Sequence, residues 1–454
     1  MAQHDELPRL PDGFVFGAST AAYQIEGAVD EDGRGASVWD TFCAEPGRIL
    51  DGSSGAVACD HYHRDPEDVA LMAALGLDGY RFSISWPRIQ PTGSGAVEPR
   101  GLDFYDRLVD ELTEAGIAPM ATLFHWDLPQ ALEDAGGWLS RETALRFGEY
   151  AAIVVDRLGD RVAQWIPVNE PNVVMTAGYA IGMHAPGRRL LFDALPVAHH
   201  LLLGHGLAVQ ALRDAGATSV GTANNHTPVW ATSGSAEDQE AASTYDLLWN
   251  RMFADPVLRG TYPDAFDGFM PGPVAEDLRV IAAPLDFYGV NYYNPTRIAG
   301  PSTPAPPDSP FAEADLPFVM LPVEGYPTTD FGWPVVPDGL GELLATLTEE
   351  YGELLPPVYV TESGCAYDDA PGADGRVHDQ RRIDYLDGHL RAVARAIDAG
   401  VDVRGYYTWS ILDNFEWAEG YTKRFGLVHV DYETQVRTPK DSYDWYARVI
   451  AEHR

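Results

Sequence analysis

Short apolar segments alternate with amphipathic segments eight times along this chain of 454 residues. The apolar segments are rich in β-branched and aromatic residues, which is typical of buried strands. The expected strands are residues 14–20, 79–86, 118–124, 162–168, 219–224, 286–292, 358–361 and 403–409. The expected helices, with apolar residues three and four positions apart, are residues 66–75, 102–115, 141–158, 192–215, 338–351, 381–399 and 440–451. This alternation predicts an α/β fold, a (β/α)8 TIM barrel of parallel strands.

A doubly wound open sheet is the alternative α/β arrangement for such a pattern. It is less favoured, because no glycine-rich phosphate loop follows any of the expected strands. Two long segments, residues 40–63 and 296–337, follow the first and the sixth strand, and the second of them is dense in proline. Loops of this length usually form lids or rims rather than domain linkers. We therefore expect a single barrel domain over residues 1–454 with long βα loops.

Composition excludes several kinds of partner. The formal net charge of -37 opposes binding to nucleic acid, to an anionic membrane surface or to a strongly anionic substrate. Cys43, Cys59 and Cys365 fit no zinc or redox spacing, and a small odd number of cysteines suits a reducing compartment. The first ten residues lack an apolar signal core, and no run is long enough to span a membrane. We expect a cytoplasmic protein that needs neither a metal nor another cofactor.

Two glutamates stand at the ends of expected strands that are far apart in the sequence. Glu362 closes the strand at 358–361, and Glu170 follows the strand at 162–168, with Asn169 before it and Pro171 after it. One polar strand end is common because the chain leaves the core there, but polar or aromatic residues follow all eight expected strands. Barrel enzymes carry their chemistry at these ends, so the two carboxyl groups can face each other across the mouth. Cleavage of a glycosidic bond needs such a pair, one protonated and one ionised.

The chain resembles glycoside hydrolase family 1, the retaining β-glucosidase and β-galactosidase family, over nearly its whole length. The resemblance rests on an ordered set of motifs at residues 14–17, 24–27, 81–88, 125–129, 169–171, 291–293, 361–364, 413–417 and 424–427. It implies that Glu170 is the general acid/base and Glu362 the nucleophile, with Arg81 and Tyr293 holding Glu362 ionised. The substrate-binding residues that it implies are Gln24, His125, Trp126, Asn169, Trp409, Glu416, Trp417 and Phe425.

The resemblance implies a retaining exo-β-glycosidase that works by double displacement through a covalent glycosyl-enzyme. The expected substrates are cellobiose, short cello-oligosaccharides and aryl β-glucosides, with some activity on β-galactosides and β-fucosides. The two catalytic carboxyl groups should lie about 5–5.5 Å apart. A 6-phospho-β-glycosidase is one alternative, but the Glu416 carboxylate would repel a phosphate and Lys423 alone is not sufficient to hold it. A catalytically silent sugar-binding relative is the other, and the presence of both glutamates opposes it.

Some positions depart from the family pattern or leave two interpretations open. Pro167 stands where the family usually has threonine, and Ser363 stands where asparagine is usual, so both put the tuning of the carboxyl pKa values in doubt. Trp409 lies in an apolar strand and fits core packing as well as sugar stacking. His184, Trp333 and the segment 296–337 are candidates for the aglycone side of the site.

Overall fold

Eight parallel strands form the centre of the computed structural model, which describes residues 7–307, 309 and 316–454. They lie in the order β4-β3-β2-β1-β11-β10-β7-β5. The barrel closes between β4 and β5, where the Trp165 amide donates to the Ser219 carbonyl at 3.0 Å and the Glu170 amide donates to the Ala223 carbonyl at 2.8 Å. The strands are β1 (Val15–Ser19), β2 (Gly79–Ser83), β3 (Ala118–Phe124), β4 (Gln164–Val168), β5 (Gly221–Asn225), β7 (Phe287–Asn291), β10 (Val358–Ser363) and β11 (Val403–Trp409). This architecture confirms the predicted (β/α)8 barrel.

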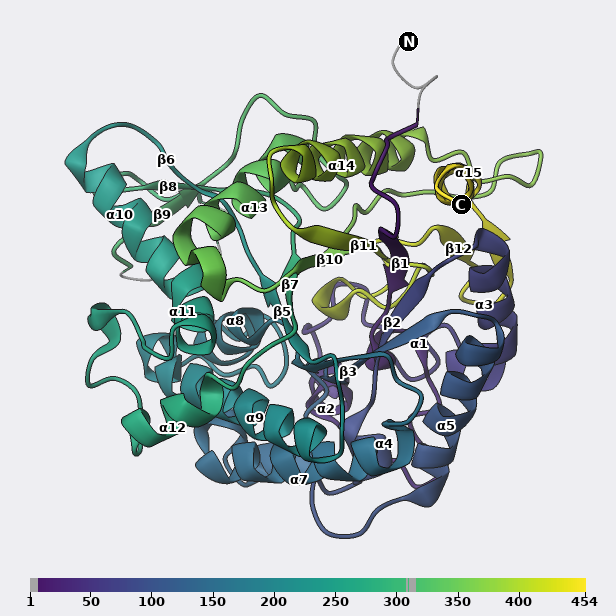
Figure 1. Cartoon of the computed structure of the whole chain (residues 1–454), viewed down its shortest axis with the longest axis horizontal. Helices are drawn as coiled ribbons and strands as arrows, with labels where there is room; N and C mark the ends of the chain where they lie inside the picture. The colour runs from purple at the N-terminus through teal and green to yellow at the C-terminus, as the bar shows by residue number, and fades with distance from the viewer. Residues whose placement is uncertain (1–6, 308, 310–315) are drawn as a thin grey trace.

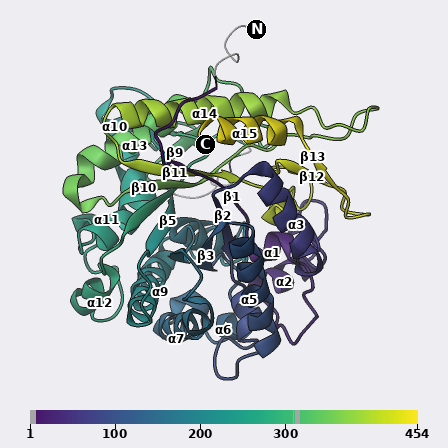
Figure 2. The same ribbon diagram turned by 45° about the vertical axis from the view of Figure 1, so that its right-hand side comes forward.

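Helices surround the strands on all sides in Figure 1, and α14 packs against α13 and α15 along one side of the barrel (Figure 2). The longer helices are α3 (His61–Leu75), α5 (Pro99–Glu114), α7 (Arg141–Leu158), α9 (Leu195–Asp214), α10 (Ala236–Asp246), α12 (Val274–Ile281), α13 (Pro337–Tyr351), α14 (Gln380–Asp398) and α15 (Asp441–Glu452). The shorter ones are α1 (Ala22–Ile25), α2 (Val38–Ala44), α4 (Trp86–Ile89), α6 (Gln130–Asp134), α8 (Pro171–Val173) and α11 (Met252–Leu258). Within the described ranges, no helix combines the length and the hydropathy that a membrane crossing requires.

Three boundaries differ from the sequence-based expectation. Helix α3 begins at His61 rather than at residue 66. Pro66 can lie inside the helix because its φ is helical, although it costs one backbone hydrogen bond. The first turn is held by a contact of 2.8 Å between His61 Nδ1 and Asp68 Oδ2. The expected loop 40–63 therefore contains the end of α2 and the beginning of α3. The expected loop 296–337 contains β8 (Thr296–Ala299) and β9 (Val319–Leu321), which form a small sheet with β6 (Val229–Ala231). Residues 308 and 310–315 of that segment lie outside the described residues.

Strand β10 continues to Ser363, so Glu362 lies within the strand rather than just after it. A register shift against β7 between Val360 and Glu362 places Glu362 opposite Asn291. The last small element is the hairpin of β12 (Val428–Val430) and β13 (Arg437–Pro439).

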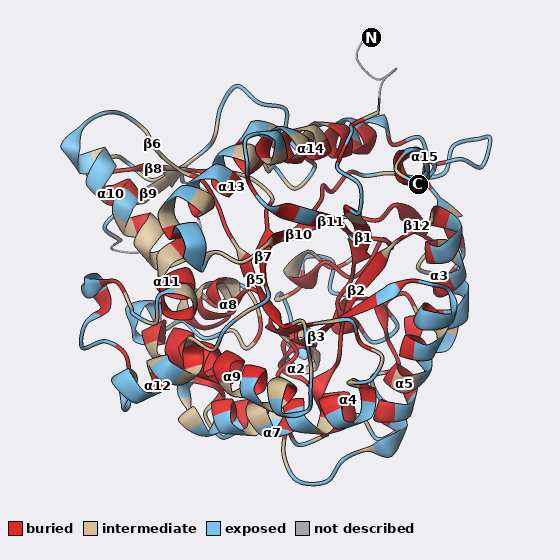
Figure 3. Cartoon of the chain, viewed as in Figure 1, coloured by how far each residue is buried: buried red, intermediate tan, exposed pale blue. Residues whose placement is uncertain are grey.

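Side chains fill the interior of the barrel, and burial is concentrated in the strands and the inner faces of the helices (Figure 3). Met120, Ile166, Phe287 and Tyr407 form an apolar cluster. Glycine is required at Gly17, because a Cβ there would lie 2.3 Å from the Tyr407 ring. The cluster leaves the carboxyl ends of the strands as the place where a cavity can form.

Candidate active site

A cavity of about 370 Å³ holds both Glu170 and Glu362 in its lining. Glu170 directly follows β4 and Glu362 lies in β10, so both come from the carboxyl ends of barrel strands. Nine further predicted or candidate residues also line the cavity: His125, Trp126, His184, Tyr293, Trp333, Trp409, Glu416, Trp417 and Phe425. Gln24, Arg81 and Asn169 lie behind this lining, where each contacts one of its residues. In the described part of the chain, no group of three His, Cys, Asp or Glu side chains could hold a metal ion.

Glu362 lies beside the strongest positive charge at the site. The Arg81 Nη1 donates to Glu362 Oε1 at 2.5 Å, and the Tyr293 hydroxyl donates to Oε2 at 2.8 Å. Burial raises the pKa of Glu362 above its usual value, and the charge of Arg81 and the hydrogen bonds from Arg81 and Tyr293 reduce this rise. Burial also raises the pKa of Tyr293, so its hydroxyl keeps its proton and can donate.

Glu170 has neutral neighbours instead. Its Oε1 accepts hydrogen bonds from Asn291 Nδ2 at 2.8 Å and from Asn225 Nδ2 at 3.0 Å. Burial, followed by the negative charge of Glu362, raises the pKa of Glu170 to about 8. The backbone at Glu170 is left-handed, with φ 47°, which is uncommon for a residue other than glycine. The surroundings thus favour a proton on Glu170 and a negative charge on Glu362.

Asn169 connects Arg81 to His125. Its Oδ1 accepts from Arg81 Nη2 at 2.6 Å, and its Nδ2 lies 3.1 Å from His125 Nε2. Because Asn169 Nδ2 can only donate, His125 Nε2 must accept and its proton is on Nδ1. That Nδ1 is buried and has no partner. Burial lowers the pKa of His125 well below its usual value, so the ring is neutral.

Gln24 and Glu416 form a second polar group. Gln24 Nε2 donates to Glu416 Oε2 at 3.2 Å, to Asn414 Oδ1 at 3.1 Å and to the Phe415 carbonyl at 2.9 Å. The Gln24 Oε1 is buried without a partner. Burial, with the charge of Glu362, raises the pKa of Glu416 to about 8. Sugar hydroxyls both donate and accept, so they match these groups.

Aromatic rings cover much of the remaining cavity wall. The ring centroids of Trp126 and Trp417 lie 4.6 Å apart, and Trp409 stacks with His125 at 5.8 Å. Phe425 meets Tyr293 edge-on at 6.3 Å. Trp409 is only 4 % exposed, so it packs in the core and lines the cavity at once.

Two asparagines that contact Glu170 were not among the residues predicted for the site. Asn291 belongs to a recognised motif, and Asn225 follows an expected strand, but neither signal indicates a contact with Glu170. The contact arises from register, because Asn225 pairs with Asn291 across β5 and β7. The Thr361 hydroxyl donates to Asn291 Oδ1 at 2.7 Å and thereby leaves the Asn291 amide group to donate to Glu170.

The two positions that depart from the family pattern are buried near the site. Pro167 lies in β4, and the Ser363 hydroxyl lies 3.1 Å from the Tyr385 hydroxyl rather than against Glu362. The candidates for the aglycone side, His184 and Trp333, line the cavity. Lys423 Nζ donates to the Asp330 carbonyl at 2.9 Å.

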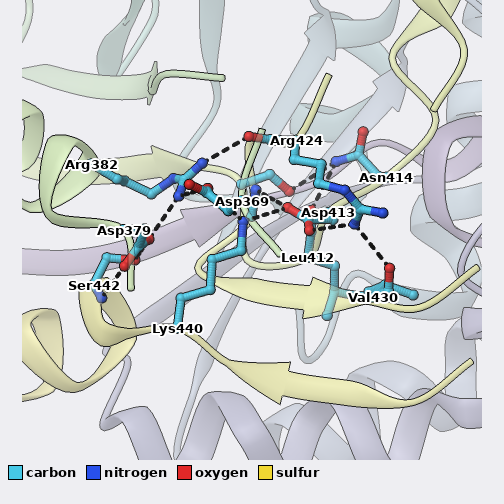
Figure 4. Close-up of polar contacts among 12 residues, drawn as sticks. Asp369, Asp379, Arg382, Leu412, Asp413, Asn414, Arg424, Val430, Lys440 and Ser442 are labelled. Carbon is cyan, nitrogen blue, oxygen red and sulfur yellow. Dashed lines mark hydrogen bonds and ion pairs between the residues drawn. The ribbon is translucent and has the colours of Figure 1, made fainter. Parts of the chain in front are cut away.

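A buried ion network holds the loop after β11, which carries Asn414 and Glu416 (Figure 4). Asp413 accepts from Lys440 Nζ and from Arg424 Nη1, both at 2.8 Å. Burial raises the pKa of Asp413, but these two cations outweigh it and hold the pKa below its usual value. Lys440 also reaches Asp369 at 3.1 Å. The network fixes the backbone beside the Gln24–Glu416 pair.

The comparison with protein families agrees with this geometry. The model described as Glycosyl hydrolase family 1 matches residues 7–454. The chain belongs to glycosyl hydrolase family 1. This glycoside hydrolase is 44% identical to beta-glucosidase A of Thermotoga maritima, over 98% of each chain. It is 46% identical to the bifunctional beta-D-glucosidase/beta-D-fucosidase of Bifidobacterium breve, again over 98% of each chain.

Solved structures give the same family. The psychrophilic beta-glucosidase from Micrococcus antarcticus superposes on this glycoside hydrolase with a TM-score of 0.94 at 49% identity, covering 98% of both chains. The Thermotoga maritima beta-glucosidase in complex with glucoimidazole superposes with a TM-score of 0.92 at 43% identity, covering 98% of this chain and 99% of that one.

Proposed function

We propose that this family 1 enzyme is a retaining exo-β-glucosidase that removes terminal β-D-glucosyl residues and also accepts β-galactosides and β-fucosides. The observation that carries the proposal is that two buried carboxyl groups face one cavity in opposed surroundings. Glu362 is paired with Arg81, whereas Glu170 is held by neutral amides. The names of the relatives, which include a glucan glucohydrolase and a glucosidase/fucosidase, support β-glucosides and β-fucosides as substrates.

The first step of the proposed reaction transfers the glucosyl group to Glu362. The Glu362 carboxylate attacks the anomeric carbon while the bond from that carbon to the aglycone oxygen breaks. Glu170 gives its proton to the departing oxygen. The products of this step are a free alcohol and a covalent glycosyl-enzyme, and Glu170 is left ionised. Arg81 and Tyr293 stabilise the Glu362 carboxylate before the attack and after its release.

The second step releases the sugar. The Glu170 carboxylate takes a proton from a water molecule, whose oxygen attacks the anomeric carbon and displaces Glu362. Two inversions at this carbon return the β-configuration. Gln24, His125 and Glu416 would hold the hydroxyls of the sugar, with Asn169 orienting His125. Trp126, Trp409, Trp417 and Phe425 would enclose its ring.

NMR of the first product from a nitrophenyl β-glucoside tests the stereochemistry, and we expect β-glucose before mutarotation. Early α-glucose would contradict the proposal. The substitution Glu362→Ala removes the proposed nucleophile. It should lower kcat by about 10⁴-fold or more, by analogy with the loss of other catalytic nucleophiles. The circular dichroism spectrum should stay unchanged, and turnover close to that of the parent would contradict the role of Glu362.

A 6-phospho-β-glycosidase is the competing assignment. Among the described residues that line the cavity there is no lysine or arginine, whereas four glutamates are present, so a phosphate would find no cation with which to pair. Rates on nitrophenyl β-glucoside and on its 6-phosphate separate the two assignments. We expect hydrolysis of the first and little of the second, and the reverse order would favour the phosphoglycosidase.

A further inference from the structure

A second cavity, of about 380 Å³, lies beside the one that holds the two glutamates. Its walls come from the helical turns η2 (Val174–Ala180), η3 (Leu191–Ala194) and η4 (Leu247–Arg251), and from β9. Among its described lining residues none carries a charge or an amide side chain. The polar atoms on its walls belong to one threonine, one tyrosine and two tryptophans. We use the name apolar chamber for this cavity.

The apolar chamber shares a wall with the active-site cavity. Ala177, Met183, Tyr245, Trp249, Met320 and Trp333 line both. The Tyr245 and Trp249 rings stack at 5.9 Å, so two aromatic side chains of this wall contact each other. The two cavities are therefore adjacent, with these six side chains between them.

The shared wall lies on the side of the site where the departing group would emerge. Asn225 donates to Glu170 Oε1 at 3.0 Å, and its Oδ1 accepts from Trp249 Nε1 at 3.3 Å. In the proposed reaction Glu170 protonates the aglycone oxygen, so the aglycone lies next to Trp249. Glu416, which with Gln24 of α1 would hold the sugar, lies on the loop after β11 instead.

Large apolar side chains are exposed where the apolar chamber meets solvent. Met183 is 47% exposed, and Leu191 and Phe192 are each 45% exposed. An apolar chain that covers these side chains removes apolar surface from water, which is favourable. A second sugar unit would find few hydrogen-bond partners there, and its desolvated hydroxyls would cost free energy.

We propose that the apolar chamber binds the hydrocarbon chain of an alkyl aglycone, so that the preferred substrates are β-glucosides of long-chain alcohols rather than cello-oligosaccharides. This inference rests on the proposed function and names the substrate class of the same site. Asn225 contacts both Glu170 and Trp249, and Trp249 lines both cavities, so an aglycone is favoured over an unrelated ligand as the occupant.

A series of alkyl β-D-glucosides from ethyl to octyl, assayed with the parent enzyme, tests the inference. The KM should fall about two- to fourfold for each methylene added beyond butyl, as expected when each methylene is buried. Cellotriose should show no such gain over cellobiose. A KM that is independent of alkyl length, or one that falls with cello-oligosaccharide length instead, would overturn the inference. Hydrolysis of nitrophenyl β-glucoside in the same assay would show that the proposed function survives that failure.

Two variants alter the apolar chamber in different ways. Phe192→Asp places a charge at its mouth, and Ala180→Phe fills part of its volume; neither residue lines the active-site cavity. Each should raise the KM for octyl glucoside at least fivefold and flatten the dependence of KM on chain length. Phe269→Asp is the matched control, because Phe269 is 59% exposed and lines neither cavity. The inference would be contradicted if KM depended on chain length in both chamber variants as it does in the parent enzyme. It would also be contradicted if Phe269→Asp raised the KM for octyl glucoside as much as the chamber variants do.

Discussion

Glu170 and Glu362 carry the same carboxyl group in different surroundings, and their neighbours account for the difference. Glu362 contacts a guanidinium and a phenol, whereas Glu170 contacts two amides and is exposed to the negative charge of Glu362. These contacts favour the proton on Glu170 and the charge on Glu362, which is the arrangement that the proposed acid and nucleophile require.

The alkaline limb of the pH–rate profile should report the loss of the proton from Glu170. The proposed reaction needs the proton of Glu170, and the pKa of Glu170 is raised to about 8, so kcat/KM should fall as the pH rises through about 8. The Asn225 hydrogen bond stabilises the ionised form and lowers the pKa. Asn225→Ala should therefore move the alkaline limb upward by about 0.5–1 pH unit, the equivalent of one hydrogen bond.

Asn294→Ala is the matched control for this shift. Asn294 lines the same cavity, but its amide donates to the Pro295 carbonyl rather than to Glu170. We expect its alkaline limb to coincide with that of the parent enzyme. A downward shift in Asn225→Ala, or an equal shift in both variants, would contradict the role given to Asn225.

Buried ion pairs, rather than helix or strand hydrogen bonds, hold the loop after β11 in its conformation. Its Asp413 is fully buried and contacts Lys440, Arg424 and the Gly426 amide. Asn414 in the same loop accepts from Gln24, so the ion network is one contact away from the sugar-binding pair. A cation removed from this network leaves an anion buried without its partner.

Lys440→Met should destabilise the protein strongly. Both Lys440 and Asp413 are 0% exposed, and removal of one partner of such a pair costs about 3–5 kcal/mol of unfolding free energy. The protein has one other lysine, Lys423, whose side chain is 20% exposed. Lys423→Met should cost about 0–1 kcal/mol. Urea unfolding measures both, and equal losses would show that the buried network adds no special stability.

The whole molecule carries a large excess of negative charge. It has 68 acidic and 31 basic residues, and its isoelectric point is near pH 4.5. At neutral pH the surface therefore repels itself, which opposes the compact state. Salt reduces this repulsion, because the screening length falls from about 30 Å at 0.01 M to about 3 Å at 1 M.

The Tm at pH 7 should consequently rise by roughly 2–5 °C between 0.01 and 1 M sodium chloride. Differential scanning calorimetry at several salt concentrations measures the change. The same series at pH 4.5, where the net charge is near zero, serves as the control and should show a much smaller slope. Equal slopes at the two pH values would mean that net charge is not the cause.

The fold was accessible from the sequence because each barrel strand is locally encoded. All eight strands lie within or beside the apolar segments that predicted them, and the eightfold alternation with helices leaves few topologies. The errors lie where distant contacts decide. Helix α3 begins before Pro66 because His61 is held by Asp68, and β8 and β9 form only because β6, from another segment, provides a pairing partner.

The sequence alone determined the barrel, the family resemblance and the two glutamates at the strand ends, because hydrophobic period and motif order are properties of the chain. The tertiary structure decided which groups surround each glutamate. Barrel closure between β4 and β5, with the register of β5 and β7, brings Asn225 and Asn291 to Glu170, and the curvature of the barrel brings Arg81 of β2 to Glu362 of β10. The tertiary structure also decided the place of the apolar chamber, whose walls come from five separate segments. Both depend on distances between residues far apart in the chain, which no local pattern encodes.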